Sequence, residues 1–231
     1  EGEYYPLSGS RSYAAWPGGI TDADEERLSK AGLLFEEPDS QVQVASGLAR
    51  HWPDARGVFA TPSLGFAVSV NDEEHLCLIA QQRGPGALGQ AFQRLAGALE
   101  ALEASLAQQG HAFMCNNRLG FLTTCPSNIG AALRVSVTVR LPLLSERSDF
   151  VRLCRGLSLR PTRAARSEGG VGVWDLWISS AVPGALQTAG QLVAAMARGC
   201  CHLLNLEAAL GRGEELPAAQ LGLLGTAKTL P

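Results

Sequence analysis

A strictly alternating segment in the middle of the chain, preceded by a cysteine-containing turn, constrains the fold most. Residues 133–141 place leucine or valine at every odd position and arginine, serine or threonine at the even positions between them. This period of two predicts a β-strand with one buried and one solvent-facing side. Just before it, Pro126 and Gly130 mark a turn that interrupts strand pairing, and Cys125 opens that turn. A thiol at the end of a half-buried sheet, with Arg134 on the polar face, suits anion recognition near a reactive thiolate.

The rest of the chain alternates between strand and helix patterns without an internal repeat. Residues 65–70 and 75–81 are apolar runs joined by a short polar turn, and they predict an antiparallel hairpin. Thr21, with Asp24 three residues later, predicts the capped start of a helix that runs through Phe35. Further helices are expected at 87–109, 148–157 and 185–210, and a further strand at 171–178. We therefore expect an α+β fold in which helices pack on one side of an antiparallel sheet.

Length, charge and cysteine spacing exclude several functional classes. With 231 residues, 46% of them hydrophobic, the chain can bury one sizeable core. A formal net charge of -3 argues against nucleic-acid binding, which needs a dense basic surface, and no apolar run approaches the length of a membrane span. The six cysteines lack CxxC spacing and the four histidines lack metal-ligand spacing. We therefore expect no metal site, no membrane partner and a reducing, cytoplasmic location.

Several motifs of this chain occur in the same order in one known family. Residues 124–130, Thr-Cys-Pro-Ser-Asn-Ile-Gly, together with Leu133 and Arg134, resemble the reactive-cysteine signature of the phosphagen kinases. These are the creatine and arginine kinases, which move a phosphoryl group between ATP and a guanidino compound. Further matches follow in order at residues 4–7, 45–50, 52–57, 70–76 and 110–114. The resemblance extends over residues 4–215, nearly the whole chain.

The resemblance implies a domain organisation as well as a fold. It corresponds to the family's catalytic C-terminal domain, of the guanidino kinase and glutamine synthetase type. The helical N-terminal domain and the first strands of the catalytic domain have no counterpart here. We expect this N-terminally incomplete domain at residues 1–215 and an extended tail at residues 216–231. The chain begins at Glu1 rather than Met, as a piece of a longer protein would. An uncovered sheet edge and the tail would both favour contact with a partner chain.

The acidic residues at the polar turn have two interpretations. As surface turn residues, Asp72 and Glu73 need no function. The resemblance instead implies that Glu73 holds the guanidino substrate, with Asp72 replacing a glutamate beside it. Paired carboxylates suit bidentate recognition of a planar guanidinium and can help to deprotonate it. The resemblance also implies that Cys125 lies near that guanidinium as a thiolate, so these three residues are the candidate catalytic residues.

The phosphate-binding arginines of the family are only partly retained. Family members surround the phosphates with arginines, because phosphoryl transfer depends on positioning and charge neutralisation. By resemblance, Arg134 is retained in its motif, whereas Cys77 stands where another arginine belongs. An ungapped alignment gives the position of the mobile-loop arginine to Thr162, with Arg163 next to it. Two further arginines lie upstream of Tyr4 in the family.

The contacts to adenine are reduced in the same way. The resemblance implies histidines at the positions of Gly32 and Thr138, and neither is a histidine here. Asp175 matches an aspartate near the nucleotide, although an aspartate between Trp174 and Trp177 is also compatible with a purely structural role. Arg134, Arg163 and Asp175 are therefore the candidate nucleotide-binding residues.

These substitutions lead to a functional expectation with one alternative. We expect a catalytically impaired phosphagen kinase-like domain that acts as a scaffold or binding module, with protein partners and without a cofactor. The alternative is an active ATP:guanidino phosphotransferase that uses Mg-ATP or Mg-ADP with creatine or arginine, its missing arginines supplied by an upstream segment. Because members of the family occur in flagella as multi-domain proteins, a ciliary or flagellar axoneme is the implied location beside the cytoplasm.

Overall fold

The computed structural model describes residues 1–164, 170–179 and 188–216 of the chain, apart from the side chains of Val42 and Ser127. Contacts divide these residues into two compact units. The N-terminal unit comprises residues 1–114 and 123–125, and the C-terminal unit comprises residues 115–122 and the described residues from 126 onward. The tail expected at 216–231 lies outside the described residues, except for Leu216.

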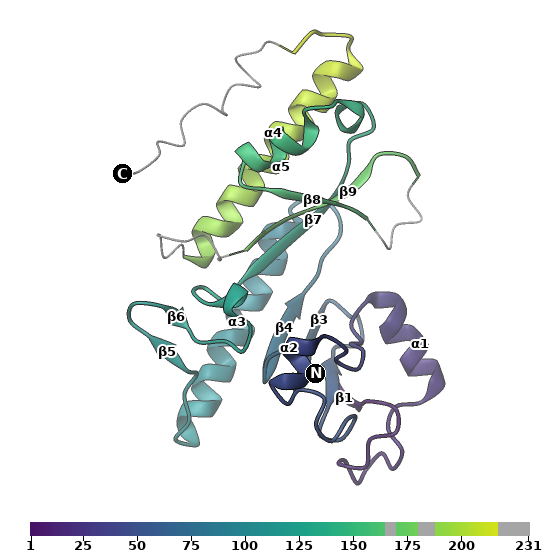
Figure 1. Ribbon diagram of the computed structural model, residues 1–231, viewed down its shortest axis with the longest axis vertical. Helices are drawn as coiled ribbons and strands as arrows, with labels where there is room; N and C mark the ends of the chain where they lie inside the picture. Colours follow the sequence, from purple (N-terminus) through teal and green to yellow (C-terminus); the bar gives the residue numbers. More distant parts are fainter. Residues whose placement is uncertain (165–169, 180–187, 217–231) are drawn as a thin grey trace. The chain divides into compact units, whose positions relative to one another are not determined.

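The N-terminal unit is built on a four-stranded antiparallel sheet (Figure 1). Its strands lie in sequence order: β1 (Glu3–Pro6), β2 (Gly57–Ala60), β3 (Phe66–Val70) and β4 (Leu76–Ala80). The helices of this unit are α1 (Asp22–Ala31), α2 (Gln41–Ala45) and α3 (Ala87–Gln108), of which α3 lies against β4. Val58 and Ala67 of the sheet belong with Leu28 of α1 to one fully buried cluster. Burial of these apolar side chains is what holds α1 on the sheet.

The hairpin predicted at residues 65–70 and 75–81 is confirmed as β3 and β4. Val70 pairs with Leu76, so residues 71–75 form the connection. The Asn71 backbone N–H donates to the His75 carbonyl at 3.0 Å, and the Asn71 side-chain amide donates to the Ala55 carbonyl at 2.8 Å. Asn71 has a φ of 56°, in the left-handed region that asparagine tolerates better than most residues. This turn holds the acidic residues 72–74 at the tip of the hairpin.

Helix α1 begins as predicted but ends earlier. Thr21 is the N-cap, and its hydroxyl accepts a hydrogen bond from the Asp24 backbone N–H at 3.3 Å. The helix ends at Ala31, not at Phe35, because Gly32 adopts a left-handed φ of 69°. The Leu33 N–H then donates to the Leu28 carbonyl at 3.0 Å and closes the C-terminus. The apolar pattern extends past this glycine, and it was therefore wrong as a guide to the helix end.

The C-terminal unit contains a three-stranded antiparallel sheet in the order β7 (Arg134–Arg140), β9 (Val173–Ser179), β8 (Arg160–Arg163). Helix α5 (Ala189–Gly211) packs on β7 and β9, and α4 (Phe150–Gly156) packs on β8. A short hairpin, β5 (Cys115–Asn116) and β6 (Gly120–Phe121), precedes the single turns η1 (Pro126–Asn128) and η2 (Leu144–Glu146). Antiparallel strands with packed helices are the α+β architecture expected from the sequence.

The alternating strand and the flanking helices follow their sequence patterns. On β7, Val135 and Val139 are buried while Arg134 and Arg140 are exposed, as the period of two requires. The helices expected at 148–157 and 185–210 correspond to α4 and α5, and residues 185–187 of that prediction lie outside the described chain. Helix α5 begins at Ala189 because Thr188 caps it, in a reciprocal capping box with the N3 residue.

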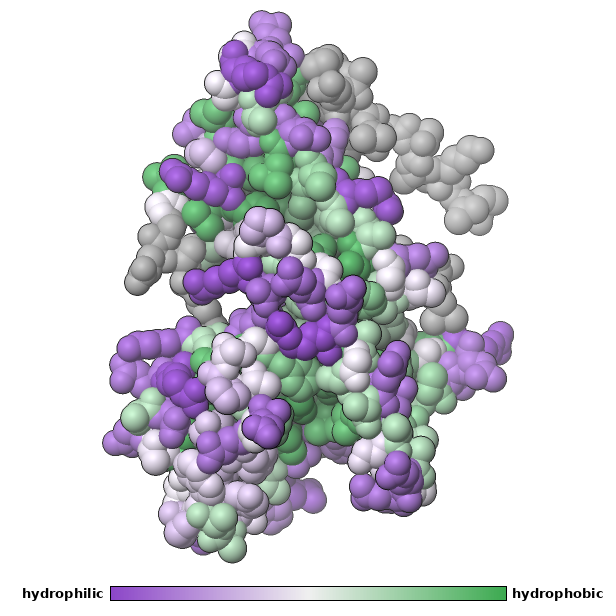
Figure 2. All heavy atoms as spheres, turned by 180° about the vertical axis from the view of Figure 1, so that it is seen from behind, coloured by the Kyte–Doolittle hydropathy of each residue, from purple (hydrophilic) through white to green (hydrophobic). Residues whose placement is uncertain are grey.

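Some large apolar side chains of the C-terminal unit remain exposed, among them Leu143, Val151 and Leu204. Figure 2 shows hydrophobic atoms reaching the surface in the upper part of the molecule, where Figure 1 draws α4 and α5. Within residues 1–164, 170–179 and 188–216, no helix is long and apolar enough to cross a membrane.

Adjacent leucines on α5 separate the buried from the exposed face of that helix. Leu203 is fully buried and Leu204 is 46% exposed. We expect Leu203→Ala to lower the free energy of unfolding by about 2–5 kcal/mol, because it leaves a cavity that the core cannot fill. Leu204→Ala, the matched control, should change it by less than about 0.5 kcal/mol. Urea unfolding followed by circular dichroism measures both, and equal losses would contradict the packing of α5.

Candidate guanidinium site and arginine face

One carboxylate joins the tip of the β3–β4 hairpin to the cysteine turn. Glu74 accepts hydrogen bonds from the backbone N–H groups of Thr124, at 2.7 Å, and of Cys125, at 3.1 Å. Hydrogen bonds to an ionised acceptor are stronger than those between neutral groups. Since Glu73 precedes Glu74 in the chain, this contact brings the candidate thiol and carboxylate into one region although they are about fifty residues apart. The residues Glu73, Asp72 and Cys125, expected together from the sequence, all belong to the N-terminal unit.

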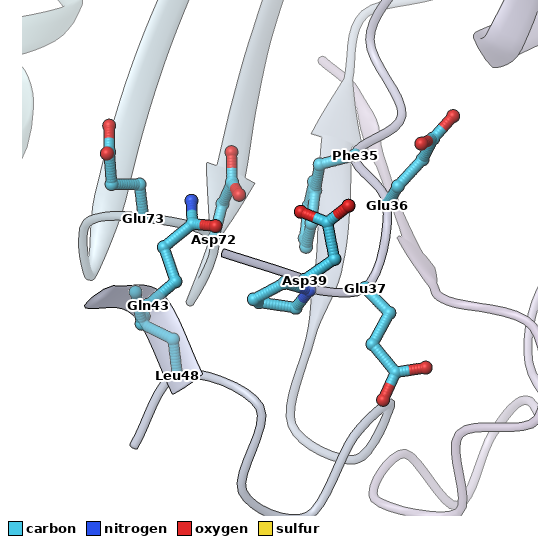
Figure 3. Close-up of a pocket in the computed structure, with 9 residues that line it drawn as sticks. Phe35, Glu36, Glu37, Asp39, Gln43, Leu48, Asp72 and Glu73 are labelled. Carbon is cyan, nitrogen blue, oxygen red and sulfur yellow. The ribbon is translucent and has the colours of Figure 1, made fainter. Parts of the chain in front are cut away.

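A pocket of about 260 Å³ opens beside the hairpin tip. Figure 3 shows the Asp72 and Glu73 side chains extending the same way from the turn, with Asp39 projecting from the segment that faces them. Phe35 forms an apolar part of the lining. The remaining lining residues are Glu36, Glu37, Pro38, Gln43 and Leu48. Five carboxylates and no lysine or arginine therefore line this pocket, which makes it attractive to cations.

A second pocket, of about 250 Å³, shares Asp72 and Glu73 with the first and extends to Glu74 and Thr124. Its lining includes one arginine, Arg56, which is 8% exposed. The Arg56 guanidinium donates to the Asp54 carbonyl at 2.8 Å and to the Arg50 carbonyl at 3.1 Å, and it also donates to the Leu48 carbonyl. Three N–H donors of the guanidinium are therefore bonded to backbone carbonyls and are not available to an incoming phosphate.

Two titratable groups near the hairpin tip have shifted pKa values. Desolvation by the surrounding protein raises the pKa of Asp72, and the charge of Glu73 raises it further, although a backbone hydrogen bond opposes this. The pKa of Cys77 is also raised, chiefly by desolvation and then by the carboxylates of residues 72–74. The Cys77 side chain is exposed, so the crowding is local and one side of the thiol still meets solvent. The position of an expected phosphate-binding arginine therefore holds a neutral thiol among negative charges.

The C-terminal unit carries the expected nucleotide-binding residues, on two different faces of its sheet. In the strand register Thr138 lies opposite Asp175, and the Thr138 hydroxyl donates to the Asp175 carboxylate at 2.5 Å. Arg134 shares this face, since it is an even number of residues from Thr138. Arg163 instead pairs with Trp174 and stacks on it at 5.5 Å, on the opposite face. The sheet therefore places Arg134 and Asp175 on one face and Arg163 on the other.

Three residues of these sites were missed by the sequence reasoning. Trp177 lies on the same face as Arg134, and the Arg134 guanidinium is 4.4 Å from the centre of its ring. Arg160 pairs with Trp177 across β8 and β9, and its guanidinium is 4.9 Å from the same ring. The sequence Arg-Pro-Thr-Arg of β8 is a weak signal that the side chains of Arg160 and Arg163 lie on opposite faces of the strand. Glu74 gave no signal, because its partners are distant backbone N–H groups.

The two units together define the class of the protein. An antiparallel sheet presents paired carboxylates beside a cysteine turn, and a second sheet presents Arg134 and Asp175, the candidate nucleotide-binding residues. These are features of the ATP-dependent guanidino phosphotransferases. The chain belongs to this class by sequence as well: residues 1–176 match the family of the ATP:guanido phosphotransferase C-terminal catalytic domain.

Individual relatives agree with this assignment. The flagellar creatine kinase of Strongylocentrotus purpuratus is 33% identical over 222 residues, which are 94% of this chain and 17% of that protein. Creatine kinase M-type of Gallus gallus is 37% identical over 171 residues, 74% of this chain and 41% of that protein. The crystal structure of a lombricine kinase matches with a TM-score of 0.83 and 29% identity, over 98% of this chain and 58% of that one. The chain thus spans less than two thirds of each of these relatives.

Members of this family use Mg-ATP. The two pockets at the hairpin tip do not fit a triphosphate, because they present carboxylates and a single arginine that is bound to backbone carbonyls. The described part of the chain also contains no group of three or more His, Cys, Asp or Glu side chains arranged to hold a metal ion. What the hairpin tip can hold chemically is a cation, and a planar guanidinium matches its paired carboxylates.

We expect Glu74→Ala to release the cysteine turn. Loss of two charge-assisted hydrogen bonds, each contributing roughly 1.5–3 kcal/mol, should speed amide hydrogen exchange at Thr124 and Cys125 by about tenfold or more. Exchange followed residue by residue with nuclear magnetic resonance measures this. Glu73→Ala, which removes the neighbouring carboxylate, is the control and should leave both amides protected. Unchanged protection of these two amides in the Glu74 variant would show that the cysteine turn is stable without the Glu74 carboxylate.

The raised pKa of Asp72 predicts a pH-dependent effect on stability. The folded state binds this proton more tightly than the unfolded state does, so the favourable contribution is present at low pH and is lost as the pH rises through the folded pKa. Asp72→Asn should therefore raise the melting temperature at neutral pH. The gain should vanish below the unfolded value of about 3.9, where aspartate is protonated in both states. Thermal melts of both proteins across this pH range measure the effect. A variant less stable than the wild type at pH 7 would contradict the prediction that ionised Asp72 destabilises the fold.

Proposed function

We propose that this chain is a catalytically impaired phosphagen kinase domain that serves as a binding or scaffold module within a larger assembly. It keeps the cation-binding half of the family's chemistry and has lost most of the phosphate-binding half. Its partners are proteins, and any guanidino compound that it binds occupies the carboxylates at the hairpin tip.

The observation that carries this proposal is the environment of Cys77. The resemblance places a phosphate-binding arginine there, and the thiol that replaces it has a raised pKa, chiefly because burial desolvates it and then because the carboxylates of residues 72–74 act on it. A phosphate brought to this position meets like charges and no compensating cation. One lost charge-assisted contact weakens binding by roughly tenfold or more, and a transition-state arginine contributes about 10³ to 10⁵ in rate.

The nucleotide side of the C-terminal unit supports the same proposal. Arg163 faces away from Arg134 and Asp175, so it does not replace the mobile-loop arginine in this arrangement. Gly32 and Thr138, at the expected positions of adenine-contacting histidines, have structural roles instead. Gly32 ends α1, and Thr138 donates its hydroxyl to Asp175. A nucleotide therefore finds few of its expected contacts.

A second candidate function is an active ATP:guanidino phosphotransferase. The Glu74 contact favours it, because the thiol turn and the substrate carboxylates are held in one place, as turnover would require. The relatives also contain sequence outside the matched stretch, since this chain spans 17% and 41% of the two creatine kinases. In such a protein the missing arginines would come from another segment. The substrate would be creatine or arginine, with Mg-ATP as the phosphoryl donor.

The location that we propose is the cytoplasm, with the axoneme of a cilium or flagellum as the particular assembly. One relative, at 33% identity, is a flagellar creatine kinase. A domain without turnover could persist in such an assembly if its surfaces bind neighbouring proteins.

The proposal predicts weak nucleotide binding and no turnover. Calorimetric titration of the purified chain with Mg-ATP should give no micromolar binding, because the phosphates lack their arginines. A coupled assay should detect no phosphoryl transfer to creatine or to arginine. Cys77→Arg alone should not restore transfer, since the neighbouring carboxylates and the other absent arginines remain.

The same measurements can reverse the order of the two candidates. Micromolar affinity for Mg-ATP, or transfer to either guanidino compound by the unmodified chain, would support the enzyme and reject the impaired domain. Glu73→Gln is the matched control for any transfer that is seen, because it keeps the shape of the side chain and removes the charge that a guanidinium needs.

A further inference from the structure

Two arginines from different strands stack on one tryptophan of the C-terminal unit. The guanidinium carbons of Arg134, on β7, and Arg160, on β8, lie 4.4 and 4.9 Å from the ring centre of Trp177, on the central strand β9. Because β9 lies between β7 and β8, the two side chains approach the indole from its two neighbouring strands. Trp177 Nε1 is buried and has no hydrogen-bond partner among the described residues. The ring is therefore held by the sheet and by the two cations. We call these three side chains the arginine–tryptophan platform.

The charges of the platform are uncompensated within the described chain. Neither Arg134 nor Arg160 lies within ion-pair distance of a carboxylate in residues 1–164, 170–179 and 188–216. Asp175 lies on the same face, where it accepts the Thr138 hydroxyl. Both arginine side chains are exposed. Two positive charges of one folded surface thus remain free to bind an anion.

Stacking on the indole prepares these guanidinium groups for binding. A guanidinium that stacks through its face keeps the N–H donors at its edge, and these match the oxygens of phosphate or carboxylate. Cation–π attraction contributes about 0.5–1 kcal/mol at exposed sites and reduces the freedom of each side chain. A ligand then has less conformational entropy to remove when it binds. Trp177 is therefore a positioning residue for both arginines.

We propose that the arginine–tryptophan platform binds a phosphorylated serine or threonine of a protein partner. A phosphate monoester carries a charge of about −1.5 to −2 at neutral pH, which matches two guanidinium groups. Asp175 adds a negative charge further along the same face, and the chain as a whole has a net charge of -3, so an extended polyanion is disfavoured and a compact one is favoured. The proposal rests on the proposed function only in taking the partner to be a protein.

The test uses capped phosphoserine amide as the probe and unphosphorylated capped serine amide as its control. Titration at low ionic strength, followed by the Nε–H resonances of the arginine side chains, should show saturable shifts with the phosphorylated probe alone. Arg134→Ala and Arg160→Ala should each weaken binding by about tenfold, the loss expected for a charge-assisted contact. Arg155→Ala, which removes an exposed arginine of α4, should leave the affinity unchanged. Trp177→Phe should retain most binding, and Trp177→Leu should weaken it while the melting temperature verifies folding.

Specific outcomes overturn the proposal. An Arg160→Ala variant with wild-type affinity would mean that the two arginines do not act as a pair. Inorganic phosphate that binds as tightly as the phosphoserine probe would assign the platform to the free ion. Tighter binding of ADP or ATP, lost in the same variants, would make it a nucleotide site and would also reject the impaired-domain proposal. Failure of the phosphoserine probe with nucleotides also unbound would reject the platform alone and leave the proposed function standing.

Discussion

The contact between Glu74 and the backbone of Thr124 and Cys125 is the interaction on which the candidate site depends. It is made by a side chain at the tip of one hairpin and by N–H groups far along the chain, at 2.7 and 3.1 Å. Backbone N–H groups at a turn must find acceptors, and a carboxylate satisfies two of them at once. The same contact therefore stabilises the turn and brings Cys125 into the region of the hairpin tip, where the candidate carboxylates Asp72 and Glu73 lie.

The charge that creates this site also limits what it can do. Carboxylates at residues 36, 37, 39, 72 and 73 line one pocket, and the arginine of the adjoining pocket donates to backbone carbonyls. Such a surface favours a cation and repels a phosphate. Burial raises the pKa of Asp72 in this region, and the charge of Glu73 adds to the increase. An active phosphotransferase must bind a cationic guanidinium and an anionic phosphate within one site. At the hairpin tip, the described residues provide only the negative charge that suits the cation.

Much of the fold could be predicted from the sequence, because periodicity reports which side of an element is buried. The hairpin at 65–81 and the strand at 133–141 are confirmed within one or two residues. The end of α1 was missed because a left-handed Gly32 overrides the apolar pattern. The candidate site was harder to predict from the sequence. Paired carboxylates and the cysteine turn are local motifs that a sequence shows directly. The partners of Glu74 depend on tertiary contacts, and the face on which Arg163 lies depends on strand register.

Strand register also determines on which face of the sheet each arginine of the C-terminal unit lies. On a strand, a shift of one residue moves a side chain to the other face. Thr162 and Arg163 are neighbours in β8, yet Thr162 lies opposite Asp175 while Arg163 stacks on Trp174. The arginine that does reach the face of Arg134 is Arg160, two residues before Thr162 and hence on the same side. The guanidinium groups of Arg134 and Arg160 therefore lie on one face of the sheet and stack on the same indole. A surface arranged in this way can bind an anion without reproducing the family's phosphate site.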